Sequence, residues 1–230
     1  MFEKWTKVLS ECELFRGITP KEIKAIFECL KPQVSNFEKN ECVAVAGEKF
    51  FGLGIVLFGE VVVAKENAAG SRAIMAVNGP GEMFGEMAAF SGDGVWPVTV
   101  AARGACTVMF LPAGKIVGSC DRPCVSHRRL ITNMLEIVSG KALLLHRKLE
   151  YLAIKSMRGK ISAFLLEQHK RAGRVNFRLP MKRNELADFL NVSRPSLSRE
   201  MCRMRDEGVI EFHKESVKIK EVDALRSMAE

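Results

Sequence analysis

Apolar residues recur at alternating steps of four and three across residues 131–152, which is the spacing of the a and d positions of a coiled coil. The seam consists of Ile131, Leu135, Val138, Ala142, Leu145, Leu149 and Leu152. Such a helix either pairs with the same helix of a second copy or packs as an ordinary amphipathic helix against its own domain. We expect a homodimer, because the segments on both sides of the seam support it.

Short β-rich runs separated by glycine-bearing turns fill residues 34–111, and this pattern predicts a sandwich or a small barrel. The expected strands are 42–46, 53–58, 61–64, 73–77, 98–102 and 107–111. Short helices precede them, one beginning at Thr19-Pro20-Lys21-Glu22, and another helix at 112–119 follows. A long helix at 122–157 then carries the seam, with Arg158-Gly159 as the expected hinge to a second domain.

A helix-turn-helix is the most specific prediction for the second domain. It follows a helix at 160–170 and a short strand at 175–179. The first helix, 182–190, should turn inward Leu186, Ala187, Phe189 and Leu190. Asn191 tolerates a left-handed turn, and Ser193 should cap a second helix with an inner face of Leu197, Met201 and Met204. Strands at 209–212 and 216–219 would form a wing.

The outer face of that second helix carries cationic and hydroxyl donors that could enter the major groove. The predicted DNA-binding residues are Arg194, Ser196, Ser198, Arg199 and Arg203. The chain has 35 Lys and Arg against 27 Asp and Glu, and its basic residues gather between 128 and 205, which favours double-stranded DNA as the partner. A helical hairpin with a solvated basic face is the alternative.

Nothing in the sequence predicts export or a membrane partner. The N-terminus lacks a basic segment followed by an apolar run, and the longest apolar stretch, 51–59, ends at Glu60, well short of a membrane span. The seven cysteines are odd in number and contain no C-x-x-C pair, which suits a reducing compartment. We therefore expect a cytoplasmic protein.

With these residues in place, the chain resembles the Crp/Fnr family of bacterial transcription regulators along nearly its whole length. The resemblance lies in Leu14-Phe15-Arg16-Gly17-Ile18, Phe58-Gly59-Glu60-Val61, Gly81-Glu82-Met83-Phe84-Gly85-Glu86, Asn184-Glu185-Leu186-Ala187, Ser193-Arg194 and Ser198-Arg199. It implies an α+β chain with an N-terminal double-stranded β-helix of the jelly-roll, cyclic-nucleotide-binding-like type (1–120), a long dimerisation helix (121–157) and a C-terminal winged helix-turn-helix domain (158–230). The implied partners are a palindromic operator, RNA polymerase and a small-molecule effector.

The resemblance is incomplete in the DNA reader. Arg194 and Arg199 occupy the places of the family's guanine-reading arginines, whereas Pro195 stands where a glutamate reads a cytosine amine. We therefore expect half-sites about 34 Å apart whose sequence differs from the commonest family consensus. Whether the protein activates or represses transcription stays open.

Two departures argue against a typical cyclic AMP site. Trp96-Pro97-Val98 replaces the Arg-Ser pair that holds the cyclic phosphate in cyclic-AMP-binding members, and Leu145-His146 replaces a Thr-Ser pair on the dimer helix. An apolar pocket around Phe84, Met87, Phe90, Trp96 and Val98 predicts a hydrophobic or aromatic ligand, with a filled barrel core as the alternative. The effector-site residues are Phe84, Gly85, Glu86, Met87, Trp96, Val98, Leu145 and His146.

The cysteines and histidines are the residues that could hold the other cofactors found in the family. Cys12, Cys29 and Cys42 are too far apart for the iron–sulfur cluster of oxygen-sensing members. Haem, which some gas-sensing relatives bind, would need His127, His146, a cysteine, a methionine or a backbone group, because residues 1–120 contain no histidine. Redox-responsive relatives suggest a disulfide between Cys12 and Cys202, and Cys120 and Cys124 could bind a metal or be modified. The alternative for these last two is simple burial.

Enzymatic function is not expected. A cupin-type metalloenzyme needs several strand histidines, which this barrel lacks, and no Ser-His-Asp or Cys-His spacing is present. A ligand-binding module whose basic domain docks on protein or a membrane surface is the remaining alternative.

Overall fold

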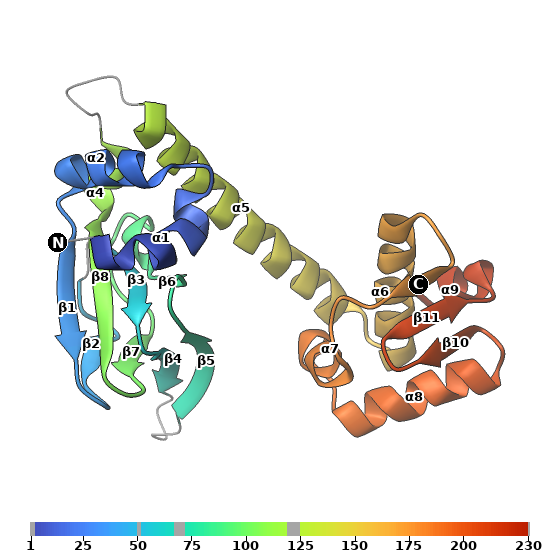
Figure 1. Ribbon diagram of the computed structural model, residues 1–230. Helices are drawn as coiled ribbons and strands as arrows, with labels where there is room; N and C mark the ends of the chain where they lie inside the picture. The colour runs from blue at the N-terminus through green and yellow to red at the C-terminus, as the bar shows by residue number, and fades with distance from the viewer. Residues whose placement is uncertain (1–2, 50–51, 67–71, 119–124, 230) are drawn as a thin grey trace. The chain divides into compact units, whose positions relative to one another are not determined.

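The computed structural model describes residues 3–49, 52–66, 72–118 and 125–229, which form two units, Met1–Gly140 and Lys141–Glu230. The boundary falls inside the longest helix, α5 (Val125–Ala153), so each unit contains part of it (Figure 1). The two units are therefore described separately below.

The first unit is built on two four-stranded antiparallel sheets, β1-β8-β3-β6 and β2-β7-β4-β5 (Figure 1). The strands are β1 (Gln33–Phe37), β2 (Cys42–Ala44), β3 (Gly52–Phe58), β4 (Val61–Glu66), β5 (Arg72–Asn78), β6 (Met83–Phe84), β7 (Thr99–Ala102) and β8 (Cys106–Pro112). Strand β1 pairs with β8, β2 with β7, β3 with β6 and β4 with β5, which is the strand pairing of a jelly roll. The predicted double-stranded β-helix is confirmed.

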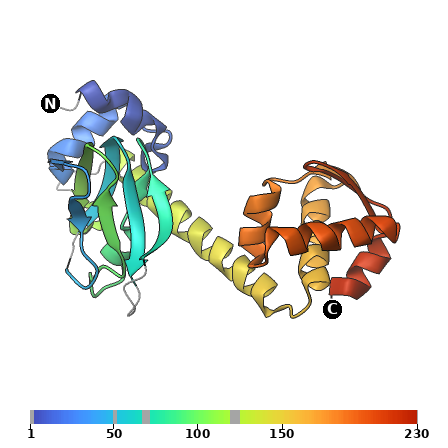
Figure 2. The same ribbon diagram turned by 90° about the horizontal axis from the view of Figure 1, so that it is seen from below.

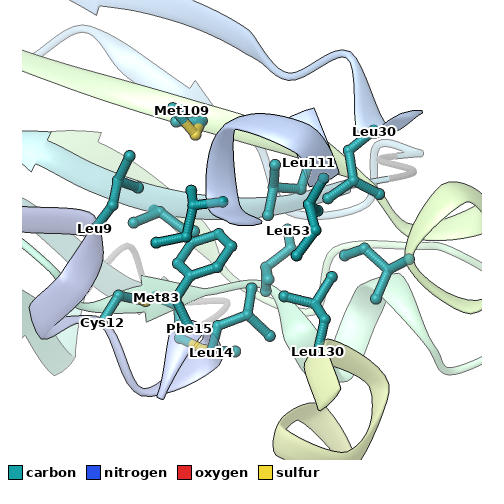
Figure 3. Close-up of a cluster of buried hydrophobic side chains, with 14 of the residues drawn as sticks. Leu9, Cys12, Leu14, Phe15, Leu30, Leu53, Met83, Met109, Leu111 and Leu130 are labelled. Atoms are coloured by element: carbon teal, nitrogen blue, oxygen red, sulfur yellow. The ribbon is translucent and has the colours of Figure 1, made fainter. Parts of the chain in front are cut away.

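Helices cover one face of the first sheet. They are η1 (Glu3–Trp5), α1 (Thr6–Glu11), η2 (Glu13–Phe15), α2 (Pro20–Leu30), α3 (Glu86–Ala89) and α4 (Ala113–Val117), with the first half of α5. Figure 3 shows side chains of these helices meeting the alternate residues Leu53, Met109 and Leu111 of the sheet. The opposite face of the same sheet carries Val56 and Val108, which pack in the core between the two sheets. The first sheet is therefore buried on both faces.

The predicted start of α2 is confirmed by a reciprocal capping box. Glu22 N donates to Thr19 Oγ1, and the Glu22 carboxylate accepts from Thr19 N at 2.7 Å. The same carboxylate accepts from Ser126 Oγ at 2.8 Å in the first turn of α5. Hydrogen bonds from Thr19, followed by that from Ser126, lower the pKa of Glu22 to about 2. The cap of α2 thus also ties that helix to α5.

A buried asparagine fastens the N-terminal loop to α5. Asn133 Nδ2 donates to Leu14 O and to Arg16 O, both at 2.9 Å. Arg16 pairs with Glu136, and Arg129 donates to Gly17 O, so the whole 14–17 turn lies against one side of the helix. These contacts explain why residues 14–17 are adjacent to α5 in space although they are distant from it in sequence.

Replacing Asn133 by leucine should destabilise the first unit by about 1–3 kcal/mol, because one buried and one half-buried carbonyl oxygen would lose their donor. The matched control is Thr132→Ala, since Thr132 is exposed and its hydroxyl bonds only within α5, to Arg128 O. Urea unfolding measures the loss, and hydrogen exchange at residues 14–17 locates it. Equal stability of the two variants would contradict this role for Asn133.

The second unit contains the end of α5 and a helical domain with a three-stranded sheet in the order β10-β11-β9. Its elements are α6 (Met157–Ala172), β9 (Asn176–Arg178), α7 (Arg183–Leu190), α8 (Arg194–Asp206), β10 (Ile210–His213), β11 (Ser216–Ile219) and α9 (Val222–Ala229). Figure 2 shows these elements, coloured from gold to red, gathered around one core. Tyr151 of α5 joins that core through ring contacts with Phe164 and Phe189.

The hinge predicted at Arg158-Gly159 is wrong. Helix α5 ends at Ala153, and α6 begins at Met157 with Ser156 as its N-cap, so the break lies at 154–156. Gly159 N donates to Ser156 Oγ at 2.8 Å inside the first turn of α6. A Cβ on Gly159 would lie 2.8 Å from Ile154 Cγ2 and 3.1 Å from Met228 O, so this glycine is required for close packing and does not end a helix.

The remaining elements lie close to their predicted positions, with two strands and two helices added. Sequence patterns missed β1, β6 and α3, which are polar or very short and give little periodicity, and also the helix α9 that follows the wing. The start of the predicted 122–157 helix lies partly outside the described residues. None of the described helices is both long and apolar enough to cross a membrane.

Candidate functional site

The helix-turn-helix forms as predicted. Asn191 adopts the left-handed conformation with φ 53° at the end of α7, and Ser193 caps α8 by accepting from Ser196 N. Five side chains form the buried interface between the two helices, namely Leu186, Ala187, Leu197, Met201 and Met204. Because the inner face of α8 is filled, its opposite face is left to solvent.

That opposite face carries the predicted DNA-binding arginines. Arg194, Arg199 and Arg203 are exposed, and 70% of the Arg203 side chain is accessible. Ser196 and Ser198 are half-buried at the edges of the face. Ser193 and Ser196 share a hydroxyl hydrogen bond of 2.8 Å, and Arg199 Nη2 donates to Ser196 Oγ at 3.4 Å. The face therefore presents long cationic donors above a preformed N-cap network.

An aromatic contact that the sequence did not predict fixes the wing against α8. The guanidinium carbons of Arg183 and Arg205 lie 5.0 and 5.7 Å from the ring centroid of Phe212 on β10. Arg183 also donates to the sulfur of Met201 in α8, and desolvation lowers the pKa of this arginine. The sequence feature that could have predicted this contact is a phenylalanine in the expected wing strand together with arginines in the two preceding helices.

The predicted dimer seam is largely exposed within a single chain. Ile131 is half-buried, whereas Leu135, Val138, Ala142, Leu145, Leu149 and Leu152 are exposed. A different side of α5 serves each unit's own core, with Leu130 and Met134 in the first and Tyr151 in the second. Packing of α5 against its own domains therefore explains the burial of Leu130, Met134 and Tyr151. It does not explain the apolar seam, which no other part of the described chain covers.

Three of the predicted effector-site residues lie together between the two sheets. Phe84, Trp96 and Val98 belong to one apolar cluster, with the Phe84 and Trp96 ring centroids 6.1 Å apart. A Cβ on Gly85 would lie 2.6 Å from Trp96 Cη2, and one on Gly54 would lie 2.3 Å from Phe84 Cζ. The Trp96 indole thus lies directly against the backbone at Gly85, and Phe84 and Trp96 are both buried.

The other predicted pocket residues do not join this cluster. Met87 is exposed, and Phe90 packs against the helical core on the other side of the first sheet. Glu86 is buried at the start of α3. The prediction that Met87 and Phe90 line the same apolar pocket as Phe84, Trp96 and Val98 is therefore wrong. The short helix α3 directs the side chains of Met87 and Phe90 to different surroundings. Leu145 and His146 belong to the second unit and are both exposed.

The two histidines named as candidate haem ligands either contact a backbone carbonyl or face solvent. His127 is buried, with its Nε2 2.8 Å from Ile116 O. His146 Nε2 lies 3.3 Å from Glu150 Oε1 on the exposed surface of α5. Among the described residues, no group of three or more His, Cys, Asp or Glu side chains is placed to hold a metal ion.

The cysteines differ sharply in accessibility. Cys12 is buried in the helical core, and burial raises its pKa to about 11, which suppresses the thiolate needed for disulfide exchange. Cys202 is half-buried on α8, and Cys29 and Cys42 are exposed. The suggested Cys12–Cys202 pair would first require Cys12 to leave its core. Cys120 and Cys124 lie outside the described residues.

Both units match known families. Residues 34–122 match the cyclic nucleotide-binding domain, and residues 159–228 match the Crp-like helix-turn-helix domain. The chain is 22% identical over 229 residues to the CRP-like cAMP-activated global transcriptional regulator of Mycobacterium tuberculosis, covering 97% of this chain and 99% of that protein. It is 22% identical over 217 residues to the cyclic AMP receptor protein of Thermus thermophilus, covering 94% and 96%.

Solved structures with the same fold include the catabolite activator protein of Thermus thermophilus, with a TM-score of 0.53 and 21% identity over 94% of this chain and 98% of that one. The sensor domain of the transcriptional regulator DNR from Pseudomonas aeruginosa has a TM-score of 0.50 and 15% identity, covering 66% of this chain and 94% of that domain. The two domain matches, the order of the domains and the full-length relatives agree, and the chain therefore belongs to the Crp/Fnr family of DNA-binding transcription regulators.

Proposed function

We propose that this regulator works as a homodimer that pairs through the α5 seam and reads a palindromic operator with the exposed face of α8. The observation that carries the proposal is the pair of exposed surfaces: an apolar heptad stripe on α5 and a cationic face on the recognition helix. A large apolar stripe costs free energy in water unless a partner covers it. A self-complementary stripe makes a second copy the natural partner, and a two-fold dimer requires a two-fold operator.

In this proposal, an effector that binds inside the β-roll is uncharged, and a charged effector would have to bind elsewhere. A cyclic nucleotide brings an anionic phosphate that needs a cationic or hydrogen-bonding partner when buried. The position that supplies this partner in cyclic-AMP-binding members holds Trp96, whose ring lies against Gly85 in an apolar cluster. The residues present therefore do not fit cyclic AMP. An apolar ligand would have to displace the buried rings of Phe84 and Trp96 or bind outside them.

Selection of random duplexes by the full-length protein, followed by sequencing, tests the DNA-reading proposal. We expect a dyad-symmetric site with half-site centres about 34 Å apart, and a steep loss of affinity as salt rises. Adding cyclic AMP to a calorimetric titration should give no heat of binding and leave DNA affinity unchanged. Enrichment of asymmetric sites would contradict the dimeric reader, and saturable cyclic AMP binding would contradict the effector proposal.

A further inference from the structure

One arginine connects the start of the DNA-binding domain to two carboxylates of the recognition helix. Arg158, the second residue of α6, donates from Nε to Glu200 Oε1 at 2.6 Å. Its Nη1 and Nη2 donate to the two carboxylate oxygens of Glu207 at 2.7 and 2.8 Å. The hydrogen bonds that Arg158 donates to Glu207, followed by the one to Glu200, raise the pKa of Arg158, so the guanidinium stays charged.

The two carboxylates lie on one side of α8. Glu207, the C-cap residue of α8, is seven positions after Glu200, which is about two helical turns, or roughly 10 Å along the axis. One planar guanidinium that bonds to both therefore restrains the helix against sliding along α6 and against rolling about its own axis. The Glu200 side chain is 14% exposed and that of Arg158 29% exposed, so water competes only partly for the bond between them, whereas the Glu207 side chain is 44% exposed.

Glu200 also lies near an arginine of the proposed DNA face. Its second oxygen, Oε2, is 3.5 Å from Arg203 Nη1, compared with 2.6 Å between Oε1 and Arg158 Nε. The short contact to Arg158 leaves Arg203 only loosely held, and 70% of the Arg203 side chain is exposed. Without Arg158, the Glu200 carboxylate would have Arg203 as its nearest cation and would draw that guanidinium down onto the helix.

We propose that Arg158 is a positioning residue for DNA reading: it fixes α8 on α6 and occupies Glu200, which leaves Arg203 free to contact the DNA backbone. The inference rests on the proposed place of Arg203 in the DNA interface. Arg158 lies two residues beyond Ser156, at the point where α5 joins the domain, so the same contact links the end of the linker to the recognition helix.

The test compares DNA binding by Arg158→Ala, Arg158→Lys and Arg203→Ala, with Arg226→Ala as the matched control. Arg226 is an exposed arginine of the same domain whose ion pair with Asp223 stays within α9. Affinity for the selected operator is measured at several salt concentrations by fluorescence anisotropy. Circular dichroism and thermal melting establish that each variant is folded.

Arg158→Ala should lower operator affinity about tenfold or more and reduce the salt slope by about 0.9 per half-site, the value for one lost phosphate contact. Lysine keeps the charge but cannot bond two carboxylates as a fork, so Arg158→Lys should give an intermediate loss even if the alanine variant unfolds. Arg226→Ala should stay within about twofold. Adding Glu200→Gln to Arg158→Ala should restore the slope, because a neutral amide does not hold Arg203.

The variants distinguish the place of Arg203 in the DNA interface from the positioning role of Arg158. If Arg203→Ala leaves affinity and slope unchanged, the proposed place of Arg203 in the interface fails. If Arg203→Ala reduces the slope while Arg158→Ala and Arg158→Lys do not, Arg203 belongs to the interface and the positioning role of Arg158 is overturned. A slope that stays low in the Arg158→Ala/Glu200→Gln double variant also overturns it, since the effect would then be purely structural.

Discussion

Replacing Arg199 by alanine is expected to lower affinity for the selected operator by at least about 30-fold while non-specific DNA binding changes little. Arg199 is exposed on α8, and the hydrogen bond that its Nη2 donates to Ser196 Oγ at 3.4 Å lies within the same helix. Alanine is a good helix former, so folding should lose little. A bidentate arginine–guanine contact discriminates by about 1–3 kcal/mol, and a homodimer would lose one contact in each half-site.

The measurement is fluorescence anisotropy with the selected operator and with a scrambled duplex of the same length. Arg226→Ala again supplies the matched loss of one positive charge, because its side chain is about as exposed as that of Arg203 on α8 and its ion pair is with Asp223 of the same helix. If affinity falls equally for the operator and the scrambled duplex, Arg199 contacts only the DNA backbone. If the variant keeps its full affinity for the operator, Arg199 does not contact the DNA.

Pro195 accounts for the expected change in operator sequence. It lies in the first turn of α8, where a missing N–H costs the helix nothing because those donors have no partner within the helix. The same substitution removes the carboxylate that would accept a hydrogen bond from a cytosine amine. The chain therefore keeps a stable recognition helix while one base position of each half-site should become less restricted.

Local patterns predicted the parts of this fold that depend on local chemistry. Alternation and turn residues located six strands, and Asn191 and Ser193 marked the helix-turn-helix, because a left-handed residue and an N-cap act within a few residues. The break in the long helix was misplaced for the same reason. Gly159 resembles a helix terminator locally, but its role depends on close packing against Met228, which is 69 positions away in the sequence.

Side-chain pairing between distant segments could not be predicted. The bonds of Arg158 to Glu200 and Glu207 span 42 and 49 positions, and no periodicity or spacing rule selects these partners among the many charged residues of the domain. The effector region failed similarly. Phe84, Trp96 and Val98 lie in one cluster, whereas the directions of Met87 and Phe90 depend on the short helix α3, which has too few residues to leave a periodic signal.

Replacing Leu149 by glutamate should dissociate the dimer and reduce operator affinity by about 10²–10⁴-fold. Leu149 is an a position of the seam and is 64% exposed in the single chain, so the monomer should tolerate the charge. In a paired seam, the two glutamates would face each other, buried and of like charge. Each monomer would then bind one half-site without the gain in effective concentration that comes from linking two readers.

Leu143→Glu is the matched control on the same helix. Leu143 is 57% exposed, close to the value for Leu149, but its b position in the heptad directs it away from the seam. It should therefore remain dimeric and bind the operator with nearly native affinity. Light scattering after size-exclusion chromatography reports the mass of each variant, and a single half-site duplex reports whether the reader itself is intact. Dimers in both variants would place the interface elsewhere, whereas dissociation specific to Leu149→Glu, with half-site binding preserved, would assign dimerisation to the α5 seam.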